Sequence, residues 1–246
     1  MTQLAGADAL TALDPVFAKL AVGAGHNLWG LTHLTMREKA FVCLTADLCH
    51  PHLDVPLAMH VQMALANGVE PESIRELYRH LAPYVGYPIL VTAFQRLTEL
   101  GLPAAEDTDA VEPVPLTGPL LRTVHSLATV DDALAAFTED QLAQRWARPY
   151  LSIRERAIAC LTVDVHYQTL GRSLRLHAEL ATSAGATENT FRDLIRGLAE
   201  FGLPRAWAAA EVLLPSGYGS AADAGEEGVA DQRAGAEDEQ ESRLAK

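Results

Sequence analysis

The chain has 246 residues, 49% of them hydrophobic and 21% charged, with a mean hydropathy of +0.05. This apolar fraction suffices for a sizeable core and excludes a wholly disordered chain. A net charge of −13 and a pI near 5.0, without any Lys/Arg cluster, exclude nucleic acid as an expected partner. The sequence contains no apolar run of about 18 residues, so no membrane span is predicted. The N-terminus lacks the features of a signal peptide, so we expect a cytoplasmic protein.

Two stretches of the chain resemble each other at a constant offset of 117 positions. Residues 34–53 read LTMREKAFVCLTADLCHPHL, and residues 151–170 read LSIRERAIACLTVDVHYQTL. Between 34–84 and 151–201, 18 of the 51 aligned positions are identical. Chance does not produce such a match, so the sequence predicts a tandem duplication.

The periodicity of both copies is helical. Thr35-x-x-Glu38 and Ser152-x-x-Glu155 each precede an apolar-periodic run, which is the signature of a capping box. Alternation of β-branched residues is absent, so the predicted fold class is all-α, with two tandem helical domains packed as a pseudo-dimer. The helices expected in the first copy are 15–24, 35–49, 54–67, 71–83 and 88–100.

Composition divides the chain further. Four prolines and four acids between residues 102 and 119 indicate an extended linker. The acidic stretch after Leu214 has few bulky apolar residues and is expected to be disordered. The expected parts are a first domain (1–101), a Pro-rich linker (102–120), a second domain (121–214) and a disordered acidic tail (215–246).

An ordered set of motifs is present in the first copy and partly repeated in the second. It consists of Asp14-Pro15-x-Phe17, Trp29-Gly30, Leu34 to Glu38, His60, Ala64 to Val69, and His80 to Pro88. This set resembles the carboxymuconolactone decarboxylase family of the alkyl hydroperoxidase D-like superfamily. The resemblance implies small all-α subunits assembled in rings, commonly hexamers. For a fused pair it implies a homo-oligomer, such as a trimer of tandem chains that forms a pseudo-hexamer.

The superfamily has a peroxidase-like branch that carries Cys-x-x-Cys followed four residues later by His. At the corresponding positions this chain has Leu53 and Pro56 before His60, and Leu170 and Ser173 before His177. Dithiol–disulfide exchange is therefore not expected. The resemblance is to the decarboxylase branch, which implies a small-molecule substrate and no cofactor.

Each candidate residue has a functional and a structural interpretation. His60 and His177 can transfer a proton near neutral pH, or they can be retained surface or interface histidines. Glu38 and Glu155 match the family's Arg-Glu motif, yet each also sits at N3 of a capping box. Arg37 and Arg154 can bind a substrate carboxylate or form ion pairs. We take as catalytic candidates His60, Glu38, His80 and Tyr84, and as substrate-binding candidates Arg37, His177 and Glu155.

His80 and Tyr84 are four residues apart and share one helical face. Their counterparts are Gly197 and Phe201, so the pair either serves the first copy alone or is used in packing. The first copy also contains more histidines than the second. This suggests that the first copy holds the better-equipped pocket and that the second has drifted towards a scaffold.

Cys49, His50 and His52 are residues of the types that bind zinc. At the corresponding positions of the second copy, only His166 is of such a type. We therefore expect no metal. Cys43 and Cys160 are expected to be buried mid-helix thiols. Asp47 and Asp164 follow four residues later, as buried paired groups or as polar helix ends.

The leading functional hypothesis is a cofactor-independent lyase that acts on a small carboxylated, lactone or polyketide-like molecule. By resemblance, the reaction is a decarboxylation in which His60 carries a proton. One alternative is a related hydrolase, cyclase or oxidative tailoring enzyme. The other is a non-catalytic ligand-binding or assembly protein.

Overall fold

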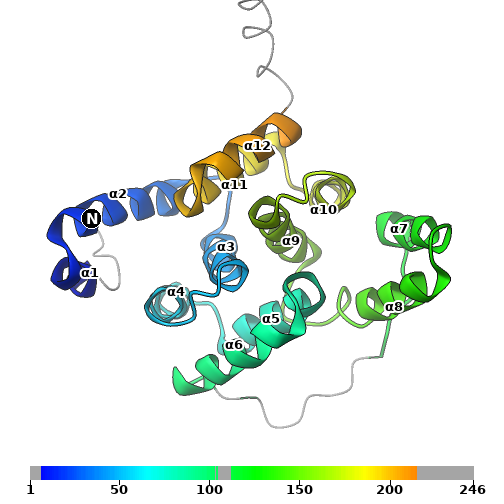
Figure 1. Ribbon diagram of the computed structural model, residues 1–246, viewed down its shortest axis with the longest axis horizontal. Helices are drawn as coiled ribbons and strands as arrows, with labels where there is room; N and C mark the ends of the chain where they lie inside the picture. Colours follow the sequence, from blue (N-terminus) through cyan, green and yellow to red (C-terminus); the bar gives the residue numbers. More distant parts are fainter. Residues whose placement is uncertain (1–6, 103, 105–111, 215–246) are drawn as a thin grey trace, which may run out of the picture.

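The computed structural model describes residues 7–102, 104 and 112–214, and this part of the chain is helical with no β-strand (Figure 1). The helices of the first half are α1 (Ala7–Leu13), α2 (Pro15–Gly30), α3 (Met36–Cys49), α4 (Val55–Ala66), α5 (Pro71–Val85) and α6 (Tyr87–Glu99). Those of the second half are α7 (Gly118–Ala128), α8 (Asp132–Ala143), α9 (Ile153–Tyr167), α10 (Arg172–Ser183), α11 (Glu188–Leu198), the 3₁₀ turn η1 (Ala199–Phe201) and α12 (Leu203–Leu213). The predicted all-α class is confirmed.

The order of α2–α6 recurs in α8–α12, which is what a duplication predicts. The domain boundaries remain a prediction. The expected acidic tail (215–246), together with residues 103 and 105–111 of the expected linker, lies outside the described residues. In the described portion, no helix combines the length and apolar character needed to cross a membrane.

Helices α3 and α9 lie side by side at the centre of the molecule, with the other helices around them (Figure 1). Every residue of α3 from Glu38 to Cys49 is buried, as is every residue of α9 from Arg156 to His166. A helix that is covered all round must occupy the interior. This explains why both helices carry apolar or small residues on nearly every face.

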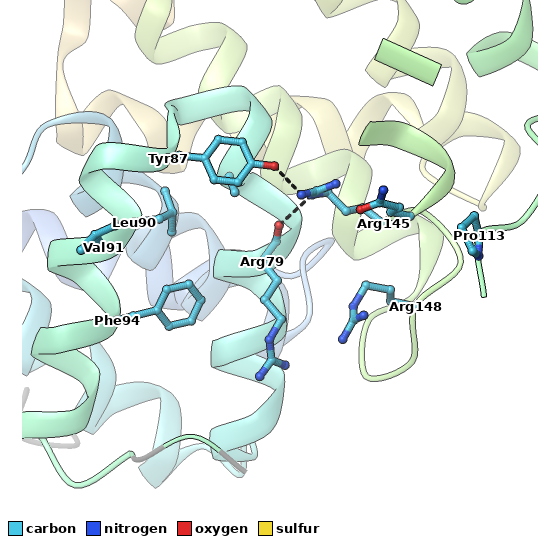
Figure 2. Close-up of a pocket in the computed structure, with 10 residues that line it drawn as sticks. Arg79, Tyr87, Leu90, Val91, Phe94, Pro113, Arg145 and Arg148 are labelled. Carbon is cyan, nitrogen blue, oxygen red and sulfur yellow. Dashed lines mark hydrogen bonds between the residues drawn. The ribbon is translucent and has the colours of Figure 1, made fainter. Parts of the chain in front are cut away.

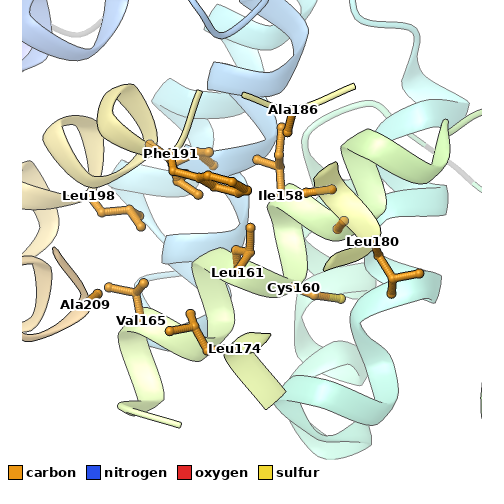
Figure 3. Packing of buried hydrophobic residues seen from close by; sticks show 14 of the residues in the cluster. Ile158, Cys160, Leu161, Val165, Leu174, Leu180, Ala186, Phe191, Leu198 and Ala209 are labelled. Carbon is orange, nitrogen blue, oxygen red and sulfur yellow. The ribbon is translucent and has the colours of Figure 1, made fainter. Parts of the chain in front are cut away.

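Two hydrophobic clusters pack against these central helices. Figure 3 shows the cluster around α9, where Leu161, Val165 and Leu174 meet Phe191 and Leu198. Each cluster includes residues of the opposite half, which reach it across the contact between α3 and α9. Leu34 and Val42 belong to the cluster of the second half, whereas Leu151, Ala159 and Val163 belong to that of the first. The two halves therefore share one continuous interior.

Two ion pairs connect the halves in a reciprocal way. Arg37 Nε donates to Glu155 Oε1 at 2.5 Å, and Arg154 Nε donates to Glu38 Oε1 at 2.6 Å. Because the partners are related by the 117-residue offset, each pair is the counterpart of the other. Such exchange is characteristic of a two-fold interface between equivalent surfaces.

Both glutamates also complete the predicted capping boxes. Glu38 accepts from the backbone of Thr35 while the Thr35 hydroxyl caps Glu38, and Ser152 and Glu155 repeat this arrangement. Each carboxylate therefore has a capping partner in its own half and an arginine partner in the other.

One helix boundary differs from expectation. Helix α2 extends to Gly30 rather than ending near residue 24. The extra turns bury Leu28 completely, and its side chain occupies the space beside Gly197 that a Cβ would fill. Tertiary packing therefore overrides the weak helix propensity of Gly23 and Gly25. Helix α7 begins at Gly118, so the last residues of the expected linker are helical.

Candidate functional site

The first half contains a buried carboxylate–imidazole pair. Asp47 on α3 and His60 on α4 lie with Oδ2 and Nδ1 2.8 Å apart, and their side chains are 4% and 16% exposed. Desolvation raises the pKa of Asp47, while the hydrogen bond from His60 acts in the opposite direction. With the Nδ1 proton held by Asp47, the Nε2 lone pair of His60 can accept a proton and later return it.

His60 lines a cavity of about 110 Å³ between helices α1, α2, α3, α4 and the end of the second half. Cys43, Trp29 and Glu200 line it as well, and Leu10 of α1 contributes to its wall. Glu200 belongs to η1, so the cavity of the first half is completed by a residue from the second. Phe201, next in sequence, lies edge-on to the His60 ring with centroids 6.1 Å apart.

Burial raises the pKa of the two other ionisable groups of the cavity, Glu200 and Cys43. Desolvation raises the pKa of Glu200, with the charge of His60 opposing the shift. Burial raises the pKa of Cys43 well above its usual value, and Glu200 and Asp47 add to the effect. Cys43 is therefore a thiol rather than a thiolate nucleophile. The cavity combines an imidazole with a carboxyl group whose pKa is raised by burial.

The second half contains the same pair in different surroundings. Asp164 Oδ2 and His177 Nδ1 are 2.6 Å apart, and both side chains are almost completely buried. The Trp146 ring stacks on His177, with centroids 6.3 Å apart, and Tyr84 lies edge-on at 5.4 Å. Aromatic rings thus occupy the space next to His177.

A hydrogen-bonded network extends this closed arrangement. Trp146 Nε1 donates to the Tyr84 hydroxyl at 2.9 Å, and His80 Nε2 lies 3.3 Å from Cys160 Sγ. Burial lowers the pKa of His80 well below its usual value, with Arg156 and His177 adding to the shift. His80 is therefore a neutral packing residue. Among the described residues, His177 Nε2 has no hydrogen-bond partner.

The structure does not bring His80 and Tyr84 to the cavity of His60. His80 and Tyr84 cross the interface on α5 and lie beside His177, in the same way that Glu200 and Phe201 cross over to His60. The pairing of these residues depends on the contact between the halves, which sequence spacing within one copy does not contain. Glu200 was not singled out because its counterpart, Pro83, carries no related chemistry.

The remaining candidates are interface residues. Arg37 donates to Glu155 and to the Tyr150 carbonyl, and Arg154 donates to Glu38 and to the Gly185 carbonyl. Both arginine side chains and both glutamate side chains thus have hydrogen-bond partners within the protein. The structure thus favours the ion-pair and capping interpretations over a substrate-binding one.

The ends of α3 and α9 bring histidines together without forming a metal site. His50 and His166 are in edge-to-face contact at 4.9 Å, and the Arg205 guanidinium contacts His50 Nε2. Burial lowers the pKa of His166 to about 3, with His50 and Arg205 contributing. Within the described residues, no three His, Cys, Asp or Glu side chains converge in a way that could hold a metal ion.

A larger cavity of about 490 Å³ lies elsewhere, between α5, α6 and the loop that precedes α9. Its lining contains three arginines and apolar side chains, but no His, Asp, Glu or Cys. Proton transfer near neutral pH needs a group that titrates there. The smaller His60 cavity is therefore the better candidate for the reaction.

Residues 15–99 match the model of the carboxymuconolactone decarboxylase family. The match begins at the first residue of α2 and ends at the last residue of α6, so it contains Asp47, His60 and the whole first repeat. The match agrees with the family predicted from the motifs of the first copy.

A crystal structure described as a putative gamma-carboxymuconolactone decarboxylase subunit from Burkholderia xenovorans LB400 is similar to this chain, with a TM-score of 0.51 and 22% sequence identity. The similarity covers 85% of this chain and 89% of that chain, so it includes helices from both halves. At this identity the likeness establishes a shared fold only. None of the curated proteins matches the chain.

Proposed function

We propose that the protein is a cofactor-independent lyase that decarboxylates a small lactone or β-keto acid, with His60 as the proton carrier. The observation that supports this function is the Asp47–His60 pair at the wall of a cavity, with Nε2 as the unengaged nitrogen of the ring. The family whose model residues 15–99 match agrees with a decarboxylation.

The proposed reaction has two steps. First, the C–C bond to the carboxylate breaks, CO₂ leaves, and the electron pair is delocalised into a dienolate or enolate. A proton must then reach the carbon that carries this electron density. His60, protonated at Nε2, is placed to deliver it, and Asp47 stabilises the imidazolium that exists beforehand. A positioned acid or base of this kind contributes roughly 10²–10⁴-fold to the rate.

Glu200 supplies a second function in this proposal. In its neutral acid form it donates a hydrogen bond to the oxygen on which the enolate charge develops, and a single donor of this type contributes about 3–4 kcal/mol. Two neighbouring groups with different protonation states are a common way of dividing acid and base roles. The small cavity, walled by Trp29, Met59 and Met63, suits a compact, mostly flat substrate.

The test is turnover followed by mass spectrometry, with carboxymuconolactone and a small panel of lactone and β-keto acids. We expect a product lighter by about 44 Da for at least one acid, the mass of CO₂, and its loss in His60→Gln. Glu200→Gln is expected to keep the fold and to lower kcat with little change in KM.

Gln62→Ala is the matched control, since it changes an exposed side chain of α4 that does not line the cavity. Its rate should stay close to that of the wild type. A product of unchanged mass would replace decarboxylation by another reaction. Absence of turnover by the folded wild type across the panel would contradict the proposal and favour a binding role.

A further inference from the structure

The larger cavity has two walls of opposite character (Figure 2). Leu90, Val91 and Phe94 of α6 form one wall, and Figure 2 shows them on the side opposite Arg145, Arg148 and Pro113. The volume of about 490 Å³ is within the range typical of small-molecule sites, roughly 300–1,000 Å³. An apolar wall facing a cationic one suits an amphipathic ligand.

The cationic wall carries more positive than negative charge. Arg148 and the fully buried Arg156 both pair with the buried Glu76, at 2.9 and 3.1 Å. Arg79 pairs with Glu72 and lies 3.6 Å from Glu76. With Arg145 included, four guanidinium groups share two carboxylates in this network. Glu76 is saturated by its arginine neighbours and cannot neutralise a further cation.

Arg145 is the guanidinium without a carboxylate. Nε donates to the Arg79 carbonyl at 3.2 Å, Nη1 donates to the Gln141 carbonyl at 2.9 Å, and Nη2 donates to the Tyr87 hydroxyl at 2.5 Å. All three acceptors are neutral, and Arg145 forms no ion pair with any carboxylate in the described ranges. A guanidinium has five N–H donors, so two remain after these bonds.

These contacts also hold Arg145 in one orientation. The side chain lies over the Tyr87 ring, with Cζ 5.8 Å from the centroid, and is anchored at each nitrogen. A pre-positioned guanidinium loses little conformational entropy when it binds an anion. Arg148 adds terminal nitrogens that have no described partner, since its one side-chain hydrogen bond among the described residues is made through Nε.

We propose that this cavity binds a small amphipathic carboxylate, with the carboxylate at Arg145 and Arg148 and the hydrocarbon part along Leu90, Val91 and Phe94. A straight-chain acid of medium length fits the wall, because α6 rises about 10 Å between Tyr87 and Phe94. The proposal concerns a second site, separate from the His60 cavity, and it does not depend on the reaction assigned there.

Titration calorimetry of the full chain with sodium octanoate tests this site directly. We expect saturable binding with one octanoate per chain that weakens as NaCl is raised, because the ion pair is partly screened. 1-Octanol and octylammonium of the same chain length should bind at least about tenfold more weakly. Equal binding of octanol would show an apolar groove only and would overturn the proposal.

Two variants separate the carboxylate contact from a general loss of structure. Val91→Glu places a carboxylate on the apolar wall at a position that is 68% exposed, so it puts a charge where the hydrocarbon part would lie without disturbing the core. It should weaken octanoate binding by about tenfold or more. Val16→Glu introduces the same charge at a 72% exposed position of α2 and should bind as the wild type does.

Arg145→Gln should also weaken octanoate about tenfold while leaving octanol binding unchanged. His60→Gln should bind octanoate normally, which keeps failure of this proposal distinguishable from failure of the proposed reaction. Unchanged binding in Val91→Glu, or no binding by the wild type at millimolar octanoate, would overturn the site. Sedimentation would also overturn the site if Val91→Glu dissociated an oligomer while octanoate binding stayed unaffected. The face would then be a contact between subunits.

Discussion

The two Asp–His pairs share residue types and geometry but not access. Asp47–His60 lies at a cavity wall, whereas Asp164–His177 is enclosed by Trp146 and Tyr84. The difference arises from the opposite half of the molecule, which supplies Glu200 and Phe201 to one pair and His80 and Tyr84 to the other. A duplicated motif therefore retains its internal hydrogen bond while its neighbours decide whether the imidazole can meet a substrate.

One pair of counterparts, Gly197 and His80, differs in what fills the space beside it. Gly197 leaves room for the side chain of Leu28 of α2. At the matching position in the other half, His80 fills the space with a ring that contacts both Trp146 and Tyr84. The His60 cavity lies in the histidine-rich first half, but two candidate residues of that half, His80 and Tyr84, lie in the surroundings of His177.

Loss of catalysis is the largest effect that would sharpen this comparison. His60→Gln should lower kcat/KM by about 10²–10⁴-fold on the acid that is turned over, because Nε2 no longer carries the proton. His177→Gln should leave kcat close to wild type, because His177 does not reach the cavity. Initial rates of CO₂ release, with circular dichroism as the folding control, measure both. Equal losses in the two variants would mean that both sites react.

The reciprocal ion pairs should differ in strength. Arg154→Ala leaves Glu38, which is 3% exposed, without its ionic partner and should lower the free energy of unfolding by about 3 kcal/mol. Arg37→Ala releases the more exposed Glu155 and should cost about 1 kcal/mol. Urea unfolding measures the two values.

Arg192→Ala serves as the control for these variants, since it breaks only a surface i,i+4 pair with Glu188 and should cost under about 0.5 kcal/mol. None of the three changes should alter kcat. A fall in kcat for Arg37→Ala at unchanged stability would restore the substrate-binding interpretation.

The buried His166, near the end of α9, should make the stability of the protein depend on pH. His166 has a pKa of about 3 in the folded protein and near 6.5 when unfolded, so the unfolded state binds the proton first as the pH falls. The folded state therefore loses about 2 kcal/mol between pH 7.5 and 5 through this group. His166→Leu should remove that loss.

Urea titrations of wild type and His166→Leu at both pH values give the comparison, with His125→Gln on α7 as a histidine control. A stability difference between wild type and His166→Leu that is the same at pH 7.5 and 5 would exclude His166 as the source.

The smallest expected effect concerns the glycine that admits Leu28. A Cβ at Gly197 would lie 2.4 Å from Leu28 Cδ1, so Gly197→Ala should destabilise by about 1 kcal/mol in spite of the better helix propensity of alanine. Gly23→Ala, in open space on α2, should instead stabilise by about 0.5–1 kcal/mol. Thermal unfolding of the two variants decides between them. A stabilised Gly197→Ala would show that Leu28 repacks freely.

Local features of this protein were predictable because short-range chemistry produces them. The capping boxes at Thr35 and Ser152 mark where α3 and α9 begin, and Pro71 marks the start of α5. The end of α2 was not predictable, because burial of Leu28 against α11 outweighs the local preference of two glycines. His60 was identified from its position in the family motif, and Asp47 from its place in the repeat.

The sequence was sufficient for the all-α class, the internal repeat, the family resemblance of the first repeat and the candidate histidines, because periodicity, caps and motif order are encoded by neighbouring residues. Which histidine faces a cavity, and which residues surround it, was decided by the packing of α3 against α9. That contact brings Glu200 to His60, and Tyr84 to His177, from more than 90 positions away along the chain. The spacing of residues within one repeat cannot predict such a partner, because the contact forms only when the two halves pack together.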